Sequence, residues 1–253
     1  MTSNRLKLNS EKTEFMIIGT KHQLSKMSFN SITIGDEIIR ARKSVRNLGV
    51  TFDSEMKMNE HVDKITRICY GKLREISSIH KYVTREVAQT LIQSMVISHL
   101  DHGNSLLYGI SVKLINKLQR VQNAAARIIL GYRKYDRISA GLFELHWLPI
   151  KYRIDFKIAT ITFKVLSTNQ PRYLRDLLEI QRNTRSLRSS SNIVLKVPKT
   201  KLKTAGDRSY SIAAPKIWND LPHTVKNASS LQQFKKDLKT FYFRRAYRHL
   251  LSK

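Results

Sequence analysis

A helical pattern of apolar and polar positions runs from residue 111 to residue 131. Ser111 is a residue type that caps helix N-termini, and Gly131 readily takes the left-handed conformation at which many helices end. The apolar positions recur every three or four residues: Leu114, Leu118, Val121, Ala125 and Ile128, with Ile115 and Ile129 beside them. This spacing predicts one α-helix whose apolar face packs into a core.

The other side of this predicted helix carries positive charge. Lys113, Lys117, Arg120 and Arg127 all fall off the apolar face. Such residues ordinarily form the solvated back of a core helix, and contact with nucleic-acid phosphates is the alternative. The helix alone does not decide between these two interpretations.

Residues 5–55 have the pattern of β-structure. Short apolar runs at 13–18, 31–39 and 47–52 predict strands. Gly35-Asp36, inside the second run, suits a two-residue hairpin turn.

From residue 59 onward the apolar spacing becomes helical. Asn59 and Thr84 are placed to cap two helices that precede the 111–131 helix. A short helix is expected at about 140–145, and Pro149 suits the start of a longer one over about 150–166.

The C-terminal part mixes short elements with one more helix. A short helix is expected after Pro171, and Ser230-x-x-Gln233 is a capping-box pattern ahead of a last helix over 230–250. The predicted fold class is α+β and mostly α-helical. It comprises a short N-terminal β-hairpin region, then a helical bundle, then a mixed C-terminal region.

The charge of the chain changes the interpretation of its basic surfaces. Its 253 residues include 46 Lys and Arg but only 19 Asp and Glu, so the formal net charge is +27. We expect a polyanionic partner, with RNA or DNA as the first candidate.

The sequence gives little sign of a membrane or of secretion. No apolar run approaches the length of a spanning helix, and residues 1–15 lack the apolar core of a secretory signal. Cys69 is the only cysteine, which excludes an internal disulfide and a thiolate cage for zinc. We expect no membrane partner and a reducing compartment, the nucleus or the cytoplasm.

The segment 181–206 is the second candidate for phosphate contact. It contains no acidic residue but seven cations: Arg182, Arg185, Arg188, Lys196, Lys199, Lys201 and Lys203. A solvated loop would have this composition too, and both interpretations stay open. The last helix ends with three further cations: Arg244, Arg245 and Arg248.

Catalytic and metal-binding signatures are weak. The chain has no glycine-rich phosphate loop, no Gly-x-Ser-x-Gly elbow and no His-Glu-x-x-His pair. His99 and His102 flank Asp101 and could in principle hold a metal, but such a pair without further placed ligands is more often structural. We expect no catalytic residues, no metal site and no cofactor.

A series of motifs then resembles one family, the non-LTR (LINE-type, jockey-like) retrotransposon reverse transcriptases. The matching segments follow the family's order along nearly the whole chain: residues 8–15 (LNSEKTEF), 46–53 (RNLGVTFD), 100–109 (LDHGNSLLYG), 118–127 (LQRVQNAAAR), 145–150 (LHWLPI), 206–208 (GDR) and 213–222 (AAPKIWNDLP). The resemblance implies three regions. Residues 1–55 would be the end of the palm with a primer-grip-like hairpin, 56–135 a thumb-like domain on the template–primer duplex, and 136–253 a basic C-terminal region.

The departures from the family decide the expected activity. The palm aspartates that hold two metal ions in the family precede its Leu-Asn-x-x-Lys-Thr motif, and only seven residues precede that motif here. His102-Gly103 also stands where the family often has Tyr-Cys. We therefore expect a C-terminal fragment that binds nucleic acid without sequence preference but is not an enzyme, which a primer-extension assay checks.

Two alternatives remain open. The chain could be a host-adopted module that binds RNA or a protein partner and has no polymerase role. Alternatively, these residues could be unable to fold without the missing palm, since strands at 13–52 would have lost their neighbours.

Overall fold

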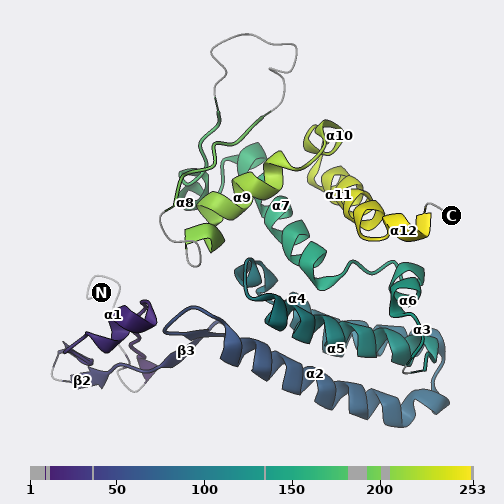
Figure 1. The fold of residues 1–253 in the computed structure, drawn as a ribbon, viewed down its shortest axis with the longest axis horizontal. Coiled ribbons are helices and arrows are strands. Elements are labelled where there is room, and N and C mark those ends of the chain that lie inside the picture. Colours follow the sequence, from purple (N-terminus) through teal and green to yellow (C-terminus); the bar gives the residue numbers. More distant parts are fainter. Residues whose placement is uncertain are drawn as a thin grey trace. The chain divides into compact units, whose positions relative to one another are not determined.

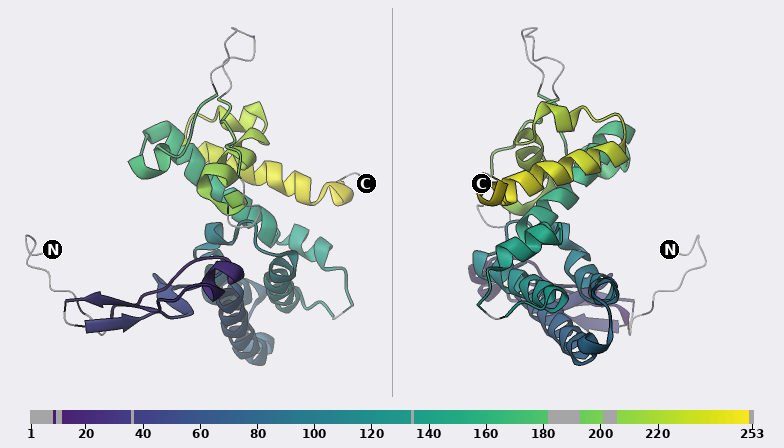
Figure 2. Two further views of the ribbon diagram at one scale, coloured as in Figure 1. Left: turned by 60° about the vertical axis from the view of Figure 1, so that its left-hand side comes forward. Right: turned by 90° about the vertical axis from the view of Figure 1, so that its right-hand side faces the viewer.

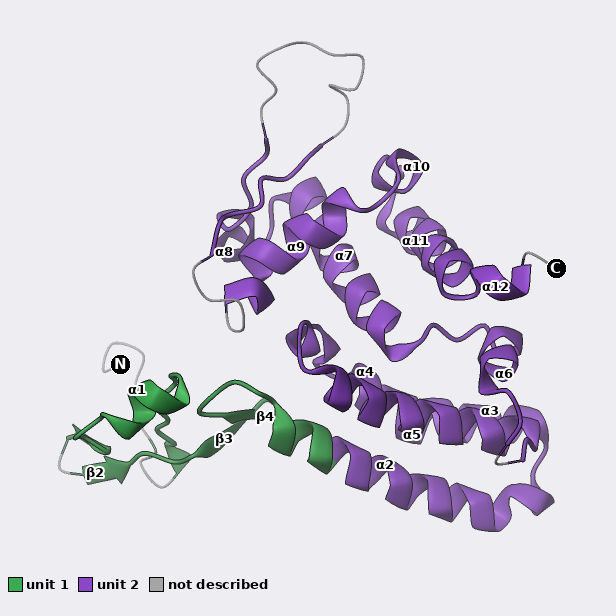
Figure 3. Ribbon diagram, in the orientation of Figure 1, with its two compact units in different colours: residues 1–64 green, residues 65–253 purple. Residues whose placement is uncertain are grey.

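The chain folds into two units, which the computed structural model describes at residues 9, 12–35, 37–133, 135–181, 193–200 and 206–251 (Figure 1). Residues 1–64 form the first unit and residues 65–253 the second (Figure 3). Helix α2 (Asn59–Ile79) begins in the first unit and continues into the second. The predicted fold class is confirmed: the protein is α+β and mostly α-helical.

The first unit contains the predicted hairpin. Strands β1 (Ser31–Ile34) and β2 (Glu37–Arg40) pair antiparallel, with Ile34 opposite Glu37. Gly35 has a φ of +62° in the turn, a conformation that glycine adopts without steric cost. Asp36, the other predicted turn residue, lies outside the described residues.

A second hairpin replaces the single strand predicted over 47–52. Strands β3 (Ser44–Asn47) and β4 (Val50–Asp53) pair antiparallel. Leu48 and Gly49 form the turn with φ values of +46° and +88°. Two successive left-handed residues match the twist of hairpin strands, so the backbone turns inside the apolar run.

The strand predicted over 13–18 is also corrected. This run contributes an isolated bridge, in which Phe15 lies parallel to Ala41. The next element is the short helix α1 (Lys21–Ser25), where Thr20 accepts a hydrogen bond from the Gln23 amide at 3.2 Å.

Asp53 organises the start of α2. Its two carboxylate oxygens accept hydrogen bonds from the amides of Lys57 at 2.8 Å and Met58 at 2.5 Å. Asn59, predicted as the cap, is instead the first residue of the helix. The carboxylate thus accepts hydrogen bonds from two amides just before the helix, and its negative charge interacts favourably with the positive end of the helix dipole.

The second unit is built from helices (Figures 1 and 2). After α2 these are α3 (Arg85–Ile92), α4 (Ser98–Asp101), α5 (Val112–Leu130), α6 (Ile138–Glu144), α7 (Ile150–Thr168), α8 (Arg172–Arg175), α9 (Tyr210–Asn219), α10 (His223–Lys226), α11 (Leu231–Ala246) and α12 (Arg248–Leu251). Short 3₁₀ turns occupy His80–Tyr82, Asn104–Leu107 and Gly206–Arg208. No helix among the described residues is long and apolar enough to cross a membrane.

The helix predicted to start at Thr84 contains an irregular middle. Thr84 does cap α3, accepting a hydrogen bond from the Val87 amide at 3.4 Å. Between α3 and α4, however, residues Gln93–Ile97 are π-helical. A π-helical segment changes the side-chain phase along a helix and frequently marks a functional position.

Helix α5 matches the predicted core helix, with its buried face shifted slightly. Leu114, Leu118, Val121 and Ala125 are buried as predicted, but Ile128 is only half-buried. Gln122, Ala126 and Ile129 complete the buried face in its place. Gly131 ends the helix in the left-handed conformation, whereas Ser111 precedes it without a side-chain capping bond.

Residues 145–150, called the connector below, link α6 to α7 and include Ile150, the first residue of α7. Side chains from distant helices hold this segment. On α5, Gln122 Nε2 donates to the Leu148 carbonyl at 2.9 Å, and Gln119 Oε1 accepts from the Ile150 amide at 2.9 Å. Tyr247, just after α11, donates its hydroxyl hydrogen to the Trp147 carbonyl at 2.5 Å. The two glutamines of the 118–127 motif therefore have structural roles.

Helix α7 is the central helix of the C-terminal half, and it contacts α5, α8, α9 and α11 (Figure 2). Phe163 on α7 stacks on Phe234 of α11 with ring centroids 4.2 Å apart, and Trp218 of α9 lies 6.1 Å from the same ring. Ser230 caps α11 through the Gln233 amide at 3.1 Å. The Gln233 side chain bonds Asp237 instead of completing the predicted capping box.

Leu118→Asp tests the buried face of α5. Leu118 is 1% exposed, so its replacement puts an unpaired carboxylate into the core. We expect a loss of more than about 3 kcal/mol in the free energy of unfolding, measured by urea denaturation. Asn116→Asp introduces the same group on the exposed side and is the control. Equal midpoints for the two variants would mean that the buried face is misassigned.

Candidate nucleic-acid interface

One side of α5 carries a stripe of cations. Lys113, Lys117, Arg120 and Arg127 follow one another at spacings of four, three and seven residues, which return to the same side of a helix. Lys113 and Arg120 are exposed, and Lys117 and Arg127 are half-buried. Helix α5 itself contains no acidic residue. The stripe lies on the side of the helix opposite the buried face.

The described part of the basic segment is anchored to α9. The Asn219 side chain accepts from the Leu195 amide at 2.9 Å and donates to the Leu195 carbonyl at 2.7 Å. Trp218 Nε1 donates to the Ile193 carbonyl at 2.9 Å, and Ile180 pairs antiparallel with Leu195. These contacts explain why the 213–222 motif contains a tryptophan followed by an asparagine.

The cations of this segment have different environments. Lys196 pairs with Glu179 at 2.7 Å, so the expectation of cations without counter-charge does not hold at this position. Lys199 is exposed. The other predicted contact residues lie outside the described residues: Arg182, Arg185, Arg188, Lys201 and Lys203.

The cations at the C-terminal end are also of two kinds. Arg244 and Arg248 are exposed. Arg245 forms an ion pair with Asp220, and this hydrogen bond raises the pKa of its guanidinium above the usual value. Arg245 is therefore partly neutralised, while Arg244 and Arg248 remain candidates for phosphate contact.

The histidine pair around Asp101 does not form a metal site. Asp101 bonds Arg153 through both carboxylate oxygens, with Arg153 Nε to Asp101 Oδ1 at 2.8 Å. Asn104 Nδ2 donates to the same Oδ1 at 3.2 Å. Over the described ranges, no group of three or more His, Cys, Asp or Glu side chains is placed to hold a metal ion.

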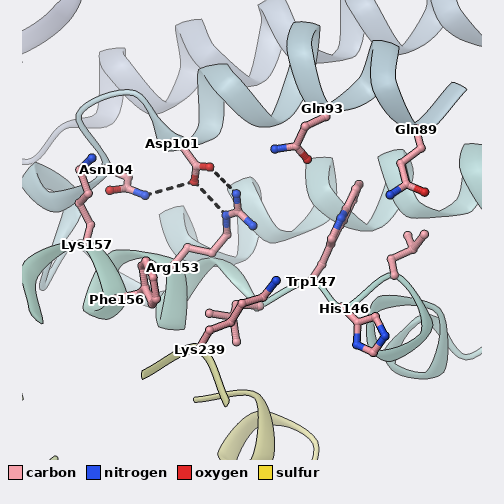
Figure 4. A pocket seen from close by; sticks show the side chains of 12 residues that line it. Gln89, Gln93, Asp101, Asn104, His146, Trp147, Arg153, Phe156, Lys157 and Lys239 are labelled. Carbon is pink, nitrogen blue, oxygen red and sulfur yellow. Dashed lines mark hydrogen bonds and ion pairs between the residues drawn. The ribbon is translucent and has the colours of Figure 1, made fainter. Parts of the chain in front are cut away.

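The Asp101–Arg153 pair forms part of the wall of a cavity of about 480 Å³ (Figure 4). Its lining comes from the α3–α4 region, the 145–150 connector, α7 and α11. The polar and aromatic lining residues are Gln89, Gln93, Asp101, Asn104, His146, Trp147, Arg153, Phe156, Lys157 and Lys239. The cavity thus combines three cations with amide and aromatic side chains.

Sequence reasoning did not single out the cationic residues of this cavity. Arg153 and Lys157 lie four residues apart on α7, a spacing that the predicted helix over 150–166 already placed on one side. Lys239 comes from α11, and only the tertiary packing brings it to them. No local pattern signals such a contact.

A second hollow, of about 350 Å³, surrounds Asp155 on α7. Burial raises the pKa of the Asp155 carboxyl to about 6, against the opposing effects of Lys151 and Arg245, while Asp220 raises it further. Tyr242 lines the same hollow, and burial raises the pKa of its hydroxyl as well. The pKa of the Asp155 carboxyl is thus well above that of an ordinary aspartate.

We compared the chain with known proteins and found no relative. No protein-family model, curated protein or solved structure matches the chain.

The raised pKa of Asp155 predicts that the free energy of unfolding depends on pH. Because its folded-state pKa is raised, its contribution to stability is fully present below about pH 4 and is lost as the pH rises through about 6. Asp155→Asn should therefore stabilise the protein at pH 7.5, by up to roughly 3 kcal/mol, and much less at pH 4.5. Urea denaturation of both proteins at the two pH values measures this difference. A difference that does not change with pH would contradict the assignment.

Proposed function

We propose that the protein binds nucleic acid with little sequence preference and that the cationic stripe of α5 is its main contact surface. The observation that carries this proposal is the division of α5 into two sides. One side is buried, and the other presents Lys113, Lys117, Arg120 and Arg127 without an acidic residue on the helix. A formal net charge of +27 adds a long-range attraction for polyanions.

The dimensions of the stripe suit a phosphate backbone. From Lys113 to Arg127 the helix rises by about 21 Å at roughly 1.5 Å per residue. Duplex DNA presents a phosphate about every 3.4 Å of axis on each strand, so several phosphates face a helix of this length. Flexible lysine and arginine side chains contact phosphates without reading the bases, and the binding is therefore sequence-tolerant.

Further cations extend the proposed surface. Lys199, Arg244 and Arg248 are exposed on the same unit as α5. Lys196 and Arg245 already have carboxylate partners, so they contribute less.

The resemblance to non-LTR reverse transcriptases favours one kind of nucleic acid as the ligand. We propose that the protein is the thumb and C-terminal portion of a non-LTR reverse transcriptase lineage, and that its preferred ligand resembles a template–primer duplex. In this proposal the protein binds such a duplex in the nucleus or the cytoplasm.

Neutralising three stripe residues tests this function. Lys113→Gln/Lys117→Gln/Arg120→Gln should weaken binding roughly 10- to 100-fold at about 0.1 M salt, equally on unrelated sequences. The slope of log K against log salt should become shallower by up to about 2.7, at about 0.9 per lost contact on duplex DNA. Fluorescence anisotropy with an RNA–DNA hybrid and with duplex DNA provides both quantities.

The control removes the same net charge elsewhere. Lys57→Gln/Lys72→Gln/Arg172→Gln neutralises three cations that are each paired with a nearby carboxylate. This variant should bind nearly as the parent does. If both triple variants lose affinity equally, binding follows net charge alone and the α5 surface is not the site.

A further inference from the structure

The cavity of about 480 Å³ beside the Asp101–Arg153 pair has the chemistry of a site for an anion with a flat ring (Figure 4). We propose that it binds one unpaired nucleotide of a nucleic-acid strand. The phosphate lies at Arg153 and Lys239, Lys157 adds positive charge to the lining, and the base lies beside His146. This inference rests on the nucleic-acid binding proposed above and adds a defined ligand and pocket to it.

The charge of the lining favours an anion. Asp101 is the only carboxylate among the described lining residues, and both of its oxygens are engaged by Arg153. Lys157 and Lys239 are exposed and come from α7 and α11, so the lining keeps an excess of two positive charges. Arg153 uses Nε and Nη2 for Asp101, which leaves Nη1 for a phosphate oxygen.

The other end of the cavity suits a base. His146 is exposed, and its ring lies 5.5 Å from that of Phe243, which supports it from one side. Trp147 forms a buried wall next to it. Stacking on aromatic rings accepts any base, because every base has a π-face.

Amide groups complete this end. Gln89 and Gln93 are exposed and point toward the cavity (Figure 4). Each carries both donors and an acceptor, so each can pair with the edges of different bases. The volume also falls within the roughly 300 to 1,000 Å³ of ligand pockets.

Two backbone irregularities meet at this cavity. His146 has a φ of +53°, which is unfavourable for a residue with a side chain and typical of ligand sites. Gln93 begins the π-helical segment Gln93–Ile97, another feature found frequently at functional sites. Each irregularity lies at a residue whose side chain lines the cavity.

The first test compares a blunt duplex with the same duplex carrying a three-nucleotide single-stranded overhang, by fluorescence anisotropy. The parent protein should bind the overhang duplex roughly 5- to 100-fold more tightly, the range expected for base stacking on aromatic rings. Lys157→Gln/Lys239→Gln should abolish this preference. The control Lys164→Gln/Lys236→Gln neutralises one cation on α7 and one on α11 outside the cavity, and it should retain the preference.

The second test uses AMP and the fluorescence of Trp147. AMP should quench the tryptophan fluorescence of the parent protein. This quenching should disappear in Trp147→Phe, which keeps Trp218, and in Lys157→Gln/Lys239→Gln.

Quenching by AMP without any preference for the overhang duplex would mean that the ligand is a free mononucleotide and would overturn the strand assignment. Equal affinity for both duplexes and no quenching would overturn the pocket but leave duplex binding by α5 intact. If no nucleic acid binds, the proposed function fails, and a lack of AMP quenching would then remove the cavity inference too.

Discussion

The second unit depends on satisfying the backbone of a buried connector. Residues 145–150 carry polar amide and carbonyl groups through a region where most side chains are less than a tenth exposed. Unpaired groups there would each cost about 1 to 3 kcal/mol. Gln119 and Gln122 from α5 and Tyr247 from beyond α11 pair three of them. These hydrogen bonds connect α5, the start of α7 and the end of α11 through the same short segment.

This constraint divides the surface of α5. The side of α5 that carries Gln119 and Gln122 faces the connector. The four cations of α5 therefore lie on a different side of the helix. The same contacts hold the segment that contributes His146 and Trp147 to the cavity lining, to which α7 and α11 add Lys157 and Lys239. In our proposal, the stripe and the cavity are therefore two binding surfaces that depend on the same buried hydrogen bonds.

Much of the helical architecture could be predicted from the sequence, because long periodic patterns determine which face of a helix is buried. The hairpin around Gly35 and the cap at Thr84 follow from local chemistry in the same way. The turn at Leu48-Gly49 was missed because an apolar leucine in a left-handed conformation looks like part of a strand. The cavity was missed because Lys239 joins it only through tertiary packing. Ion pairs such as Lys196 with Glu179 were hidden because the carboxylate lies outside the acid-free segment.

The most direct test of the account is a lysine footprint of the complex. Lysines are acetylated in the free protein and in the protein saturated with an RNA–DNA hybrid, and each site is quantified by mass spectrometry. Lys113 and Lys117 should lose most of their reactivity on binding, whereas Lys72, which pairs with Glu75 on α2, should keep its reactivity. Protection of Lys72 with no change at Lys113 would contradict the assignment of α5 as the nucleic-acid surface.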